Sequence, residues 1–172
     1  SMDILVSSNL ERLLYLLSGD TALVADLMKR LNTQGSYTVP TDLLAKIQGE
    51  FWAAYCDDVR AAEIMGRVYK SYGYLCDPHT AAGWAAAEDY VTQTGDHTPM
   101  VVLSTASPYK FPAAVLTAIG GDTDGDEFCQ MERLSQLSGV PIPKNLSGLQ
   151  GKPEKHTGVI PKEKMLDFVL SL

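Results

Sequence analysis

Two short polar segments contain the residues of this chain that are best suited to bind a ligand. The first, Asp77-Pro78-His79-Thr80, has the form of a helix start, because aspartate accepts free amide N–H groups and proline fits the first helical position. His79 and Thr80 would then lie in the first turn, where the helix attracts anionic groups. The second segment, 104–111, follows the apolar run 99–103, which predicts a short buried strand. Because open α/β sheets bind ligands at the carboxyl ends of their strands, we expect this segment to border a binding site.

The elements around these segments are predicted to be mostly helical. Capping residues and apolar residues at helical spacing predict helices that begin near Ser8, Asp20, Thr41, Asp58, Asp77, Pro112, Asp126 and Pro161. Strands are expected at 99–103 and 156–160, the run 51–55 fits either a strand or a buried helix end, and 144–153 reads as a loop. No repeat or linker divides the chain, so we expect one domain.

Composition narrows the classes of protein that this chain can belong to. Its 172 residues, of which 45% are hydrophobic and 20% charged, suffice for one domain with a sizeable core. The formal charge of -7 disfavours binding to nucleic acid or to anionic lipid. No apolar run reaches the roughly 18 residues of a membrane helix, and no signal peptide is recognisable at the start of the sequence. We therefore expect a cytoplasmic protein without nucleic-acid or membrane partners.

The cysteines and the acidic run 120–126 were considered as metal sites. Cys56, Cys76 and Cys129 show no CxxC spacing, so buried free thiols are the simpler interpretation. The run 120–126 has the composition of a calcium loop, but the bidentate acid expected farther along is out of position, which favours a solvated acidic turn. We therefore expect no metal site.

Several segments of the chain together resemble threonine synthase, a pyridoxal-phosphate enzyme of fold type II. They are residues 2–13, 66–69, 72–75, 77–81 and 103–111. The resemblance identifies residues 1–172 as a single carboxyl-terminal segment of a longer enzyme, whose Schiff-base lysine and phosphate-binding loop belong to an amino-terminal part that this chain lacks. It implies an α/β fold, a helix-rich three-layer piece with a small, mostly parallel sheet flanked by helices.

The resemblance also implies a reaction and a set of site residues. The intact enzyme converts O-phospho-L-homoserine and water to L-threonine and phosphate, and the piece alone is expected to be inactive. Thr105 would face the pyridine nitrogen of pyridoxal phosphate, with Ser104, His79 and Thr80 also at the cofactor, and Arg12 would reach the substrate phosphate. The residues alone also allow a structural role for each side chain. Thr105 would then be an ordinary turn threonine, His79 and Thr80 would satisfy groups at the helix start, and Arg12 would be an exposed helix arginine.

Three other interpretations of the same residues were weighed. Ser104 or Ser107 with His79 and Asp77 has the ingredients of a hydrolase, but the G-x-S-x-G pattern of a nucleophile elbow is absent. Lys110 could form a Schiff base if it were desolvated, whereas the resemblance places that lysine upstream and leaves Lys110 a structural role. A freestanding noncatalytic module that binds a partner through the same architecture is the remaining alternative.

Overall fold

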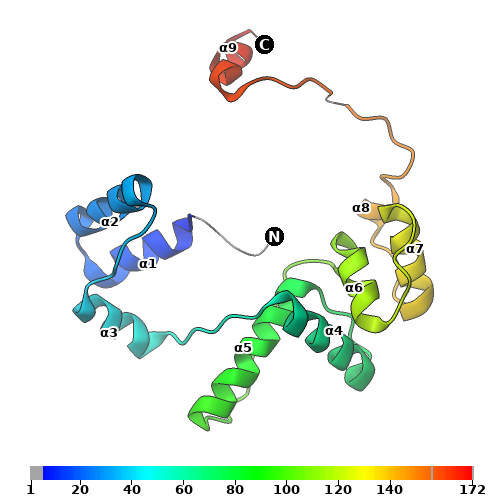
Figure 1. The fold of residues 1–172 in the computed structure, drawn as a ribbon, viewed down its shortest axis with the longest axis horizontal. Helices are drawn as coiled ribbons and strands as arrows, with labels where there is room; N and C mark the ends of the chain where they lie inside the picture. Colours follow the sequence, from blue (N-terminus) through cyan, green and yellow to red (C-terminus); the bar gives the residue numbers. More distant parts are fainter. Residues whose placement is uncertain (1–5, 156, 172) are drawn as a thin grey trace.

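The computed structural model describes residues 6–155 and 157–171, and every regular element in these residues is a helix (Figure 1). In chain order the elements are α1 (Ser8–Ser18), α2 (Thr21–Gln34), α3 (Thr41–Glu50), α4 (Asp58–Tyr72), α5 (Pro78–Thr94), η1 (Pro108–Lys110), α6 (Pro112–Ile119), α7 (Glu127–Ser138), α8 (Lys144–Ser147), η2 (Lys162–Lys164) and α9 (Met165–Leu170), where η marks a short 3₁₀ helix. Residues 2–5 of the segment 2–13 lie outside the described residues.

The helices begin where capping side chains satisfy their first amide groups. The Asp20 carboxylate accepts hydrogen bonds from the N–H groups of Ala22 and Leu23, at 2.9 and 3.0 Å, and Asp126 caps α7 in the same way. Helices α1 and α4 begin at Ser8 and Asp58, as predicted, and the residue before each of them, Ser7 and Asp57, supplies the cap. Local capping chemistry thus sets the helix starts closely.

Helices α1–α7 form two groups, each with its own core, and α9 lies apart from both (Figure 1). The α1–α3 core is made of four buried side chains, Leu14, Val24, Leu27 and Leu43. The larger α4–α7 core buries Ala61, Ile64, Met65, Val68, Leu75, Cys76, Ala81, Ala85, Tyr109, Val115, Leu116, Met131 and Leu134. The second group carries the predicted ligand-binding segments, so its packing decides how they are placed.

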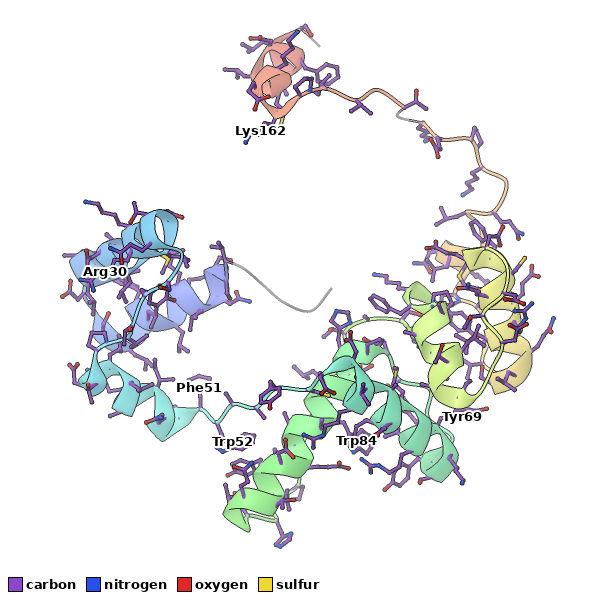
Figure 2. The ribbon with its side chains drawn as sticks, in the orientation of Figure 1. Arg30, Phe51, Trp52, Tyr69, Trp84 and Lys162 are labelled. Atoms are coloured by element: carbon purple, nitrogen blue, oxygen red, sulfur yellow. The ribbon has the colours of Figure 1, made fainter. Side chains whose placement is uncertain are left out.

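An extended segment, residues 51–57, joins the two groups (Figure 2). Phe51 and Tyr55 are exposed on it, and Trp52 meets the edge of the Tyr90 ring on α5 with 5.7 Å between ring centroids. The run 51–55 is therefore neither a strand nor a buried helix end. The Phe51 N–H donates to the Ile47 carbonyl at the end of α3, at 2.8 Å, but no strand pairs with this run among the described residues, and its aromatic side chains lie on the surface.

Packing of α4 against α5 and α6 fixes the frame of the second group. The Arg60 guanidinium on α4 binds the Asp89 carboxylate on α5 through both oxygens, at 2.6 and 2.7 Å. On another side of α4, Gly66 lies against the backbone of Ala118 in α6, so closely that a Cβ atom at this position would be 2.5 Å from the carbonyl oxygen. The two contacts hold α5 and α6 at defined positions on α4.

The expected sheet is wrong for the residues that the structure describes. Residues 99–103 are extended and run back beside α5, but no second segment pairs with their backbone groups, and no strand is found in residues 6–155 or 157–171. Val101 is 86% exposed and Leu103 76%, whereas a buried strand would cover both. A strand exists only through the ladder to its neighbour, and the apolar run alone does not supply that neighbour.

The carboxyl-terminal region differs from the expectations in smaller ways. Part of the predicted loop 144–153 forms the short helix α8, and residues 157–160 of the predicted strand are irregular, while His156 lies outside the described residues. The closing helix after Pro161 is present as η2 and α9. Among the described residues, no helix combines the length and apolar character that crossing a membrane requires.

Candidate functional site

The first turn of α5 and the segment that begins at Ser104 meet at one end of an open groove. Thr80 and Ser104 both line this groove, which has a volume of about 750 Å³. The chain turns back after α5, so that residues 98–104 run along the helix and bring Ser104 to its beginning. The two predicted ligand-binding segments are therefore neighbours, although they are not joined by a sheet.

A buried carboxylate, that of Asp77, organises the start of α5. One of its oxygens accepts a hydrogen bond from the His79 backbone N–H at 2.9 Å and lies 3.0 Å from the His79 ring nitrogen Nδ1. The other oxygen accepts the hydroxyl proton of Thr80. Burial alone would raise the pKa of Asp77, but the hydrogen bonds from Thr80 and His79 lower it overall. The group is thus a buried anion fixed by its donors, which confirms the predicted cap.

Three hydroxyl groups extend from this carboxylate towards the groove. The hydroxyl oxygens of Thr80 and Ser104 are 3.0 Å apart, and the Tyr74 hydroxyl lies 3.1 Å from the Ser104 hydroxyl. Thr80 is 2% exposed, whereas Ser104 lies on the surface of the groove. A continuous line of hydrogen-bonded oxygens therefore joins the buried Asp77 to a surface where a ligand can bind.

The remainder of the groove is apolar with one braced carboxylate. Trp84 on α5 donates its indole N–H to one oxygen of Glu88 at 2.9 Å, and Arg67 on α4 donates to the other at 2.7 Å (Figure 2). This contact raises the pKa of the Arg67 guanidinium. Both Glu88 oxygens thus accept a hydrogen bond within the protein, and the rest of the groove is lined mostly by aromatic and apolar side chains, with Thr92 as a further polar one. The aromatic and apolar side chains are those of Tyr74, Trp84, Ala87, Val91, Met100 and Val102.

His79 and Thr105 lie at the outer side of the same end. The His79 ring packs against Phe111 with 5.0 Å between ring centroids, so the ring is held by Phe111 and by Asp77. Thr105 is exposed, and its hydroxyl makes no hydrogen bond to any residue that the structure describes. Of the four residues predicted at the cofactor, Thr80 and Ser104 are in contact and His79 and Thr105 are each adjacent in the chain to one of them.

Arg12 is not brought to this site. It lies on α1, in the group formed by α1–α3 (Figure 1), and its side chain hydrogen-bonds the carbonyl and hydroxyl oxygens of Ser8 at 3.1 and 3.2 Å. These contacts are those of a helix-surface arginine. A role of Arg12 at the substrate remains a prediction that the arrangement of the two groups does not support.

The hydrolase arrangement is not formed in the described residues. Ser104 is bonded to Thr80 and Tyr74, and the Ser107 hydroxyl accepts the Tyr109 N–H at 3.3 Å, so neither serine is hydrogen-bonded to His79. A nucleophilic serine needs that contact to lose its proton. The residue types of a triad are present without its geometry.

The acidic run 120–126 is held by side-chain donors. The Arg133 guanidinium donates to the carbonyl oxygens of Asp122 and Asp124, at 3.0 and 2.9 Å, and the Gln130 amide donates to those of Thr123 and Gly125, at 2.7 and 3.3 Å. A calcium loop of the EF-hand type binds its ion mainly through carboxylates, whereas here the Asp122 carboxylate lies 3.0 Å from the Arg133 guanidinium. The contacts are those of an acidic turn closed by α7.

Sequence reasoning missed the other residues of the groove, Tyr74, Trp84 and Glu88. A signal for two of them exists, because Thr80, Trp84 and Glu88 follow one another at intervals of four and share a face of α5. Tyr74 could not be found in this way, since its partner Ser104 is 30 positions away in the chain.

The lowered pKa of Asp77 predicts a pH dependence of stability. A carboxylate whose pKa is lower in the folded than in the unfolded chain stabilises the fold above the unfolded value, and this contribution is lost as the pH falls through the folded value. The free energy of unfolding of the wild type should therefore exceed that of Asp77→Asn at pH 7, and the difference should shrink below about pH 4. Urea denaturation at both pH values measures it. A difference that grows on acidification would contradict the assigned direction.

Comparison with known proteins gives one consistent result. A family model described as "Threonine synthase, C-terminal" matches residues 80–169, which include the whole groove apart from Tyr74. The threonine synthase of Pseudomonas aeruginosa is 40% identical over 164 residues, which is 89% of this chain and 34% of that protein. Human threonine synthase-like 1 is 35% identical over 120 residues, which is 69% of this chain and 16% of that protein.

Solved structures agree with these matches. The pyridoxal-phosphate-bound threonine synthase from Brucella melitensis superposes with a TM-score of 0.64 at 38% sequence identity, over 77% of this chain and 28% of that one. The chain thus spans about a third, or less, of the length of the relatives that it matches.

Proposed function

This chain belongs to the threonine synthase family, and on that premise we propose that it forms the carboxyl-terminal part of an enzyme that converts O-phospho-L-homoserine and water to L-threonine and phosphate in the cytoplasm. The observation that supports the proposal most directly is the contact between the Thr80 and Ser104 hydroxyls, 3.0 Å apart, because it joins the two segments expected at the cofactor. The buried Asp77 behind Thr80 holds this contact in place.

The residues at this end of the groove suit pyridoxal phosphate. The exposed hydroxyl of Thr105 suits a pyridine nitrogen, since a hydroxyl can pair with it without holding a positive charge on the ring. The His79 ring, braced by Phe111, would limit the movement of a planar ligand beside it. When bound, pyridoxal phosphate supplies an electron sink for proton removal and phosphate elimination. The role of the four side chains is to bind and orient it.

The positions of the lysines support the proposal that this chain lacks the Schiff-base residue. All lysines of the chain fall within the described residues, all of them are exposed, and none lines the groove. A Schiff-base lysine works from a desolvated position at the pocket, where its amine is readily deprotonated. Lys110, the lysine nearest in sequence to Ser104, is exposed at the end of η1. We therefore assign the Schiff base to the part of the enzyme that this chain does not span.

The same part of the enzyme is the partner that we propose for the exposed apolar surface beside the groove. Met100, Val101 and Leu103 present large apolar side chains to solvent, and their backbone groups are unpaired among the described residues. Exposed apolar surface of this kind marks a contact with another part of a protein. The relatives have about two-thirds of their length outside the matched region, which is enough to cover it.

Covalent trapping tests whether the Schiff-base lysine lies outside this chain. The purified chain is incubated with pyridoxal phosphate, reduced with borohydride and digested, and the modified peptides are mapped by mass spectrometry. We expect low, scattered labelling of surface lysines and no threonine formation, because no lysine is desolvated at the groove. A stoichiometric adduct at one lysine, Lys110 above all, would show that the chain carries its own Schiff-base residue and would overturn the assignment.

A further inference from the structure

Counting protons fixes the direction of the hydrogen bonds between Asp77 and the groove. The ionised Asp77 carboxylate only accepts, so the single hydroxyl proton of Thr80 must point at it. The oxygen of Thr80 then has only lone pairs to offer to Ser104, 3.0 Å away. Ser104 must therefore donate its own proton to Thr80, which commits that proton to the interior of the protein.

The same count of protons fixes the direction of the hydrogen bond between Tyr74 and Ser104. With its proton used, Ser104 can only accept from the Tyr74 hydroxyl, which lies 3.1 Å away. Ser104 then has one hydrogen-bonding position left, and it is a lone pair. The chain of donors runs in one direction, from Tyr74 through Ser104 and Thr80 to Asp77, and every member is satisfied.

We propose that this one-way chain makes Tyr74 a positioning residue of the cofactor site and sets Ser104 to present a lone pair, not a proton, to the bound ligand. The functional part of the inference rests on the proposed function, in which Ser104 borders pyridoxal phosphate. The inference gives the two adjacent hydroxyls different roles. Thr105 makes no hydrogen bond to the described residues, so its proton is free to be donated to a ligand. Thr105, which the resemblance already places at the ring nitrogen, can donate there, whereas Ser104 accepts from a ligand N–H or O–H group.

The chain of donors can be tested without any ligand. The 172-residue chain is labelled at the tyrosine ¹³Cζ atom, whose chemical shift reports on the hydrogen bond of the hydroxyl, and the Tyr74 signal is assigned with Tyr74→Phe. Thr80→Val removes the acceptor of the Ser104 proton, which frees Ser104 to donate to Tyr74. The Tyr74 signal should move, although no hydrogen bond joins Thr80 and Tyr74 directly in the described residues. Thr80→Ser keeps the hydroxyl and should leave the signal at the wild-type position.

A second background makes the test specific. In Ser104→Ala the connection is cut, so adding Thr80→Val should not move Tyr74 any further. The proposal would be overturned if Thr80→Val left the Tyr74 chemical shift unchanged. It would also be overturned if Thr80→Val changed that shift by the same amount with and without Ser104→Ala. The ¹⁵N–¹H spectrum of the α4–α7 core checks that each variant is folded. Because no cofactor is used, failure here leaves the borohydride result untouched, and a failure of the proposed function leaves this measurement interpretable.

Discussion

Gly66→Ala is expected to lower the free energy of unfolding of the α4–α7 core by about 2–3 kcal/mol, towards the upper end of the cost of overpacking. The added Cβ would lie 2.5 Å from the carbonyl oxygen of Ala118, and this atom belongs to the backbone of α6 and cannot rotate away. Helix α6 would have to move off α4. The loss should outweigh the gain of about 1 kcal/mol that alanine brings to a helix interior. Urea denaturation followed by tryptophan fluorescence measures the change.

Gly49→Ala is the matched control. Gly49 also lies in a helix, α3, but a Cβ there meets nothing within 4 Å. The same substitution should therefore be neutral or slightly stabilising at this position. If Gly66→Ala were as harmless as Gly49→Ala, the close approach of α4 and α6 would be wrong. The expected contrast also gives a physical reason for the glycine in the segment 66–69, which resembles the family.

Asp77→Ala is expected to destabilise the chain by about 2–4 kcal/mol, the sum of a lost helix cap and of a buried hydrogen bond to a charged group. The substitution removes the acceptor of the His79 N–H and of the Thr80 hydroxyl, and both donors lie in partly or fully buried positions. Thermal and urea denaturation report the loss. Because Thr80 would then be free to donate to Ser104, the variant should also change the Tyr74 signal described above.

Two variants show whether burial is the cause. Asp126→Ala removes an N-cap of the same type from α7, where the capping residue is exposed, and should cost clearly less than Asp77→Ala. Asp77→Asn keeps an acceptor for the helix and should fall between the wild type and the alanine variant. Equal losses for Asp77→Ala and Asp126→Ala would mean that Asp77 is an ordinary cap with no further role.

The helices could be predicted from the sequence because their signals are local. Asp20, Asp77 and Asp126 cap helices through amide groups two or three residues away, and Gly35 and Gly120 end helices in the left-handed conformation. These interactions lie within a few residues of each terminus. Helices α1 and α4 likewise begin at the predicted residues Ser8 and Asp58, each after a residue with a capping side chain.

The predicted sheet failed because its signal is not local. The run 99–103 has the composition of a buried strand, but a strand also needs a partner that the run itself does not specify. Among the described residues no partner is present, and Val101 and Leu103 are exposed. The same limit applies to Arg12, whose distance from the predicted site depends on how α1–α3 are joined to the rest of the chain.

The candidate site was predicted in part. Thr80 and Ser104 were expected at one site and are in contact, while the resemblance rather than any spacing suggested that they belong together. Tyr74 completes the chain of donors. It lies in the segment 72–75 that resembles the family, but no spacing tied it to Ser104, which is 30 positions away in the chain. Assignment of the four polar residues to a cofactor remains a proposal, supported by Thr80 and Ser104, which line the groove, and by His79 and Thr105, which adjoin them in the chain.

Replacement of the matching region in a working enzyme tests the central claim most directly. In the Pseudomonas aeruginosa threonine synthase, the region that matches this chain is exchanged for the chain, and the chimera is expressed in a threonine auxotroph. Growth without threonine, absent when the matching region is simply deleted and reduced by Thr105→Val, is the result that we predict. A chimera that is expressed and folded but forms no threonine from O-phospho-L-homoserine would contradict the claim that this chain forms the carboxyl-terminal part of the enzyme.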